Sequence, residues 1–124
     1  MRTMDTRLRM PSMPASARRA RRFVADVLHH QDADHVSEVC VLLTSELVAN
    51  AVRYARSDVE LRIDFVEGAV RIGVHDHSEV RPVARSVEID SVSGRGLGLV
   101  DTLSSAWGID LTGRGKEVWF EVKL

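Results

Sequence analysis

Three glycines alternate with other residues between positions 94 and 98 and run directly into an apolar segment. The stretch reads Gly94-Arg95-Gly96-Leu97-Gly98-Leu99, and the apolar pattern continues to Leu103. Glycine lets a ligand approach backbone N–H groups closely, and a helix begins with unpaired N–H groups at the positive end of its dipole. The pattern therefore predicts a flexible phosphate-binding loop that leads into a helix over about residues 96–105.

This glycine run differs from the two commonest phosphate-binding loops. It lacks the Gly-Lys-Ser/Thr of the Walker loop, and Leu99 stands where the dinucleotide-binding fingerprint requires glycine. The preceding residues, 79–93, are polar and irregular, so they do not form the strand that both motifs need. A different nucleotide-binding fold is implied.

A second pair of polar residues lies on a helix predicted from a cap at Asp34 to about Ala55. One turn apart, Glu46 and Asn50 project within about 40° of each other, on the flank of the apolar stripe. Such a pair is usually only solvated, so it becomes a candidate site through its context. The stripe itself consists of Val36, Cys40, Leu43, Leu47, Ala51 and Tyr54.

A carboxylate ends the apolar face of a predicted strand. Alternating apolar residues predict two strands, over 59–65 and 70–74, joined by a hairpin turn at Glu67-Gly68. Continuing the second alternation by two residues leads to Asp76, which should be partly buried. A buried carboxylate needs hydrogen-bond donors, and the exocyclic amine of a purine is one candidate. A cap on the following turn is the alternative interpretation.

Size and composition indicate one domain. The chain has 124 residues, of which 44% are hydrophobic, and a net charge of −1, so no global basic field favours nucleic acid as a partner. Residues 1–13 are expected to be flexible, with an edge strand around Arg7–Met10, and residues 14–124 to form the domain. The lone Cys40 excludes an internal disulfide and is expected in the core of a cytoplasmic protein. No apolar run approaches the roughly 20 residues that span a membrane.

The order of elements predicts the fold class. Helices over 15–30 and 34–55 precede the first two strands, and the third helix precedes strands around 107–111 and 118–122 with a turn at 113–115. This order predicts an α+β two-layer sandwich, with a mixed, mostly antiparallel sheet covered on one face by about three helices. The histidines do not suggest a metal site, because His75 and His77 face away from Asp76 and the others lie at a helix end.

These motifs together resemble the GHKL ATPase/kinase superfamily over about residues 15–124. Residues 46–51 resemble its N box, Asp76-His77-Ser78 its first glycine box, and Gly94–Leu99 its second. The ending around Trp107-Gly108 and residues 115–121 is most similar to the small stand-alone anti-sigma-factor serine/threonine kinases of actinobacteria. The resemblance implies the GHKL fold and the binding of ATP and Mg²⁺.

The resemblance also implies roles for individual residues. Asn50 would hold Mg²⁺, Glu46 would act as general base, and Asp76 would accept from the adenine amine. Residues 79–93 would form a lid over the phosphates. The cofactor-binding positions implied around these residues are Arg53, Ser78, Gly94, Arg95, Gly96, Leu97, Gly98 and Lys116, with Arg95, Lys116 or Arg53 supplying a cation.

One departure from the superfamily pattern leaves two functions open. Ser78 and Val80 stand where the first glycine box has glycines. The leading hypothesis is a partner-switching kinase that binds a sigma factor and phosphorylates an anti-sigma-factor antagonist. The alternative is a non-catalytic regulatory module with a degenerate or absent nucleotide site. Superfamily members often dimerise, and the first helix or a sheet edge would supply that contact.

Overall fold

The two alternating segments form the centre of an antiparallel sheet. In the computed structural model, which describes residues 5–55, 57–78 and 94–124, strand β2 (Val59–Val66) turns at Gly68 into β3 (Ala69–Asp76). Gly68 has a φ of 71°, which suits glycine in a tight turn. The remaining strands are β1 (Asp5–Met10), β4 (Ala106–Leu111) and β5 (Lys116–Lys123).

The sheet has the order β1-β2-β3-β5-β4. Each described pair of neighbouring strands is antiparallel, so the sheet is not mixed as the sequence suggested. The expected edge strand around Arg7–Met10 is present and begins at Asp5, pairing with β2 along its whole length. This part of the N-terminal segment therefore belongs to the sheet.

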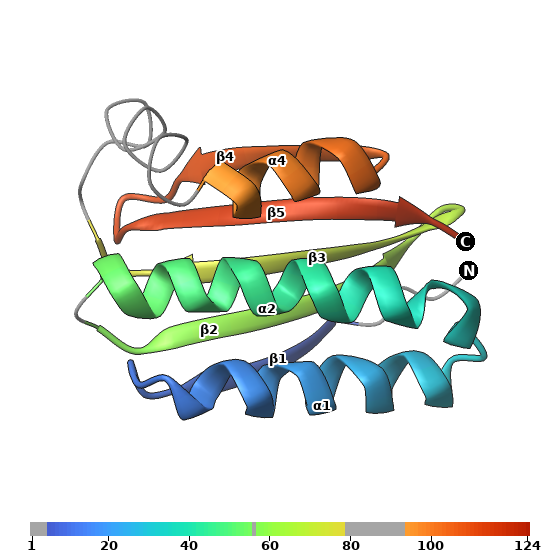
Figure 1. Cartoon of the computed structure of the whole chain (residues 1–124), viewed down its shortest axis with the longest axis horizontal. Coiled ribbons are helices and arrows are strands. Elements are labelled where there is room, and N and C mark those ends of the chain that lie inside the picture. The colour runs from blue at the N-terminus through green and yellow to red at the C-terminus, as the bar shows by residue number, and fades with distance from the viewer. Residues whose placement is uncertain (1–4, 56, 79–93) are drawn as a thin grey trace.

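Three helices cover one face of this sheet (Figure 1): α1 (Ala15–His30), α2 (Ser37–Tyr54) and α4 (Gly94–Leu103). The predicted α+β two-layer sandwich is thus confirmed. Helix α2 lies centrally, between α1 and α4, and buries Cys40 and Leu47 against the sheet. Burial raises the pKa of the Cys40 thiol to about 12, so this cysteine is an unreactive core residue.

The outer face of the sheet is charged and needs no helical cover. Arg62 pairs with Glu117 at 2.8 Å, and Arg71 pairs with Glu121 at 2.6 Å while lying 4.2 Å from the ring centroid of Trp119. Burial raises the pKa of Glu117, and Arg62 opposes that shift. Because polar residues alternate with apolar ones along each strand, the sheet packs helices on one side only.

The start of α2 differs from the prediction. Asp34 does not cap it: the residue lies in a 3-10 turn, η1 (Asp34–Val36), and α2 begins at Ser37 without a side-chain cap. The Asp34 carboxylate instead lies 3.1 Å from Nδ1 of exposed His29. A direct contact between the two side chains has replaced the expected backbone cap.

Helix α4 also begins earlier than predicted. It starts at Gly94, so the three alternating glycines belong to its first turns and do not form a loop ahead of it. The backbone N–H groups at a helix start lack intrahelical partners wherever the helix begins. The anion-binding end of α4 therefore moves toward residue 94.

Helix α2 and the turn before it are unusually apolar. By length and composition alone, the 21 residues of Asp34–Tyr54 could cross a membrane, so the expectation that no segment approaches that length is wrong for this helix. In the fold, α2 is the central helix and places a row of buried residues against the sheet. Core packing accounts for its apolar composition.

Candidate functional site

The candidate site residues gather at one end of the sandwich. Figure 1 shows that β3 ends, β5 begins, α2 ends and α4 begins at this same end. The turn between β4 and β5 also lies there. Segments far apart in the sequence thus place the N box, Asp76 and the glycine run around one region.

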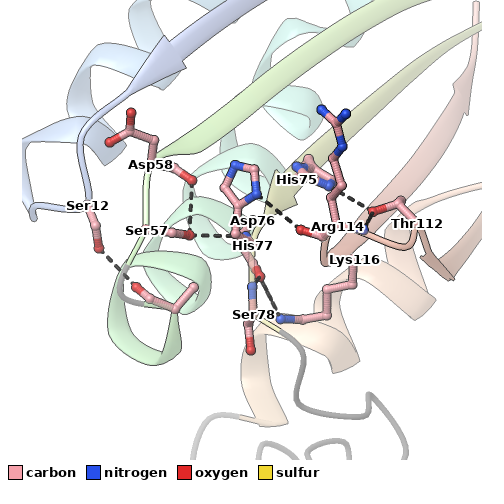
Figure 2. A network of polar contacts seen from close by, with 11 residues as sticks. Ser12, Ser57, Asp58, His75, Asp76, His77, Ser78, Thr112, Arg114 and Lys116 are labelled. Atoms are coloured by element: carbon pink, nitrogen blue, oxygen red, sulfur yellow. Dashed lines mark hydrogen bonds and ion pairs between the residues drawn. The ribbon is translucent and has the colours of Figure 1, made fainter.

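Asp76 and Lys116 form a buried ion pair at this end. Their side chains stand directly opposite each other on β3 and β5, and only 2% of Asp76 and 8% of Lys116 is exposed. The Lys116 Nζ lies 3.0 Å from both Oδ1 and Oδ2 of Asp76. Figure 2 shows the Lys116 side chain reaching the Asp76 carboxylate. The sequence placed Lys116 near the phosphates; the structure pairs it with the carboxylate expected to recognise the base.

Asp76 also shows the capping role that was the alternative interpretation. Its Oδ1 accepts a hydrogen bond from the backbone N–H of Ser78 at 2.8 Å. The carboxylate therefore has charged and neutral donors, which compensate for its removal from water. The two interpretations are compatible, because among residues 5–55, 57–78 and 94–124 the Ser78 and Lys116 contacts leave acceptor capacity on the carboxylate.

The close approach of two strands makes this pair possible. Gly115, just before β5, has a φ of 141°, and a Cβ there would overlap the carbonyl oxygen of Asp76 and lie 2.7 Å from Cα of His77. Only glycine fits against β3 at this point. Gly115 thus allows β5 to approach β3 closely enough for the Lys116 side chain to contact Asp76.

Hydrogen bonds join the outer side of the same end of β3 to the neighbouring loops (Figure 2). The backbone N–H of His77 donates to Ser57 Oγ at 3.0 Å, and His77 Nδ1 lies 3.1 Å from the carbonyl oxygen of Arg114. His75 Nε2 lies 3.0 Å from Thr112 Oγ1. These contacts join the loop after α2, the end of β3 and the turn before β5.

Sequence reasoning missed this positioning network. It considered His75 and His77 only as metal ligands, and their rings instead make an edge-to-face contact with centroids 5.2 Å apart. Their alternation with Asp76 did predict that they face away from it. The partners Ser57 and Thr112 carried no local signal, because they lie 20 and 37 residues from the histidines that they contact and meet them only in the fold.

Helix α2 presents Glu46 and Asn50 on the flank away from α1. Ser45 marks the α1 side, since its Oγ accepts a hydrogen bond from Arg21 at 2.9 Å. At about 100° per residue, Glu46 and Asn50 point to the other flank, which faces α4. Both side chains are half-buried.

Arg53 lies in different surroundings. Its exposed guanidinium is 5.7 Å from the ring centroid of Tyr54, and it lines a pocket of about 510 Å³ between α1 and α2. The other lining residues are mostly apolar: Ser12, Pro14, Ala17, Ala49 and Val52. Its role toward phosphate stays a prediction.

Part of the predicted site lies outside the described residues. The predicted lid at 79–93, including Val80, is not described, and neither are the side chains of residues 94–97, which include Arg95 and Leu97. Their roles stay predictions. The described backbone places Gly94, Gly96 and Gly98 in the first turns of α4, where unpaired N–H groups favour an anion.

The oxygen donors present suit Mg²⁺ held together with phosphates. No cluster of three or more His, Cys, Asp or Glu within the described ranges could hold a metal by itself. Mg²⁺ usually takes one or two protein oxygens and completes its shell with phosphates and water. The half-buried Asn50 amide, with Glu46 one turn away, fits that mode of binding.

A family model described as a histidine kinase-like ATPase domain matches residues 10–122, and the chain belongs to this family. The resemblance to the GHKL superfamily is thereby confirmed.

A solved structure shows the same fold. The chain is similar to "the RsbU and RsbW domains of Rv1364c from Mycobacterium tuberculosis", with a TM-score of 0.74 and 22% identity. The match covers 98% of this chain and 32% of that one, so this chain spans about a third of its length. No curated protein matches.

We predict that the two glycine turns differ in how strictly they require glycine. Gly68→Ala places a Cβ in open space at positive φ, and should lower the free energy of unfolding by about 1–2 kcal/mol. Gly115→Ala should lower it clearly more, because its Cβ overlaps the β3 backbone. Urea denaturation measures both, and equal losses would contradict the close approach.

We also predict a pH-dependent contribution from His75. Burial and neighbouring His77 lower the pKa of His75, while Asp76 and Glu60 oppose the shift. Below about pH 6.5, the unfolded chain therefore binds a proton more readily than the folded one, and stability falls as pH falls. His75→Gln should flatten the stability profile between pH 7.5 and about pH 5, as measured by thermal denaturation.

The same substitution at His35, which is exposed, controls for the loss of a surface imidazole. A profile for His75→Gln that keeps the full wild-type slope would show that His75 titrates alike in both states.

Proposed function

We propose that this chain is an ATP-dependent protein serine/threonine kinase of the partner-switching type, acting in the cytoplasm. It would phosphorylate an anti-sigma-factor antagonist and bind a sigma factor. The observation that carries the proposal is the gathering of buried Asp76, the polar flank of α2 and the start of α4 at one end of the fold. The family match and the likeness to a structure with an RsbW domain support it.

The proposed nucleotide orientation follows from charge and position. The base would meet Asp76 at the sheet, since a buried carboxylate recognises an amine. The phosphates would meet the first turn of α4, where N–H groups and the helix dipole favour anions. Mg²⁺ bound with the phosphates would be held by Asn50 and would neutralise their charge.

The proposed transfer step uses Glu46 as the base. A seryl hydroxyl oxygen of the antagonist would form a bond to the γ-phosphorus as the bond to the ADP oxygen breaks. The hydroxyl proton would pass to the Glu46 carboxylate. Glu46 is half-buried on the flank that faces α4, one turn before Asn50, so base and metal ligand are side by side.

The first test is the Mg²⁺ dependence of ATP binding. Wild-type protein should bind ATP more tightly with Mg²⁺ than with EDTA, and Asn50→Ala should lose roughly tenfold or more of the affinity in Mg²⁺, because an oxygen ligand is gone. Isothermal titration calorimetry measures both proteins under both conditions. Glu38→Ala, an exposed change on the same helix, is the matched control.

The second test separates binding from chemistry. Glu46→Ala should bind Mg-ATP within about threefold of wild type, yet lose transfer by roughly 10²–10⁴-fold, the usual contribution of a general base. Transfer of labelled γ-phosphate to candidate antagonist proteins from the same organism measures it. Undiminished transfer by Glu46→Ala would remove Glu46 as the base.

Two outcomes would favour the non-catalytic alternative. In the first, wild-type protein leaves every antagonist unphosphorylated while still sequestering a sigma factor equally with and without Mg-ATP. Failure to bind ATP at millimolar concentration would point the same way. Either result would identify a docking module, and Glu46 would then be a surface residue.

A further inference from the structure

The buried Lys116 ammonium has hydrogen-bonding capacity left over. It carries three N–H groups, and among the described residues its acceptors are the two oxygens of Asp76, each at 3.0 Å. At least one N–H therefore has no partner within the described part of the chain. For a side chain only 9% exposed, that is unfavourable unless a ligand completes the shell.

Asp76 has matching capacity on one oxygen. Within the described part of the chain, Oδ1 accepts from both Lys116 and the Ser78 N–H, whereas the hydrogen bond to Oδ2 comes from Lys116. A carboxylate oxygen offers about two acceptor sites, so Oδ2 retains one. A donor and an acceptor thus stand side by side, both buried, on the helix-covered face of the sheet.

We propose that Lys116 and Asp76 together read the edge of the adenine ring. Asp76 Oδ2 accepts from the exocyclic amine, and Lys116 Nζ donates to the adjacent ring nitrogen N1. This inference rests on the proposed function, since it needs a nucleotide whose base lies at Asp76. It makes Lys116 a specificity-determining residue that contacts the base, in place of a cation at the phosphates.

The pair would discriminate against guanine in the same orientation. Guanine carries a carbonyl oxygen where adenine has the amine, and an N–H where adenine has N1. The carbonyl would face the carboxylate and the N–H would face the ammonium, so both contacts would be repulsive. A site whose buried polar groups are left unpaired rejects the wrong ligand strongly.

The position of Lys116 is fixed by the backbone. Asp76 and Lys116 are direct partners in the β3–β5 register, and Gly115 brings the strands close at that point. The donor therefore needs little reorganisation when a base binds, which favours affinity.

The decisive comparison changes the ligand and leaves the protein intact. In 1-deaza-ATP, N1 is replaced by C–H, so the acceptor for Lys116 is lost while the amine remains. Wild-type protein should bind it about 10- to 100-fold more weakly than ATP in Mg²⁺, the range for a hydrogen bond to a charged group. The control ligand 7-deaza-ATP, altered away from that edge, should bind like ATP.

A variant then assigns the effect to Lys116. Lys116→Met should bind ATP more weakly and bind ATP and 1-deaza-ATP about equally. Lys123→Met, at the exposed end of the same strand, should keep the wild-type ratio. Removing one partner of a buried pair destabilises the fold, so circular dichroism must first show that Lys116→Met is folded. The wild-type ligand comparison stands even if it is not.

The possible outcomes distinguish failure of this inference from failure of the proposed function on which it rests. Equal binding of ATP and 1-deaza-ATP by wild-type protein would overturn the role of Lys116 while leaving ATP binding intact. Tighter binding of GTP than ATP would overturn the adenine assignment. Failure of every nucleotide to bind would overturn the proposed function itself, and this inference with it.

Discussion

A carboxylate and an ammonium withdrawn from water constrain the end of this sheet. Each would be unfavourable alone in such a place, and together they hold β3 and β5 in register through Asp76 and Lys116. The pair requires close strands, and Gly115 is the residue that permits them. The surrounding loops then have fixed attachment points, at Ser57 on one side and Thr112 on the other. A polar end on an otherwise apolar face follows from this one interaction.

The two faces of the sheet have separate tasks. The outer face satisfies its charges internally, with Arg62 on Glu117 and Arg71 on Glu121 and Trp119. The inner face carries the core and, at its end, the ion pair, which keeps hydrogen-bonding capacity among the described residues. A site on this fold must therefore form on the helical side, where α2 and α4 can supply oxygen ligands and N–H groups.

The sequence predicted the features that depend on residues close together along the chain. The alternation that ends in Asp76 and the stripe that places Glu46 and Asn50 on a flank of α2 were both readable from spacing. The structure confirms the hairpins at Gly68 and at 113–115. The partner of Asp76 could not be read, since Lys116 lies 40 residues away and meets it only through the β3–β5 pairing. Asp34 shows a different limit of prediction from spacing. It is a residue type that caps helices, but its carboxylate contacts His29 instead, and spacing alone does not show which of the two contacts forms.

The strand order has a consequence for which parts of the molecule unfold locally. Both strands that carry the ion pair have hydrogen-bonded neighbours on each side, whereas β1 and β4 lie at the edges. Amide protons of β3 and β5 should therefore exchange with solvent only in the rarest openings of the molecule. Helix α4 has three glycines among its ten residues, each weakening it, so its amides should exchange sooner. A hierarchy of local unfolding is thereby built in, in which the helix above the site opens while the strands beneath it stay intact.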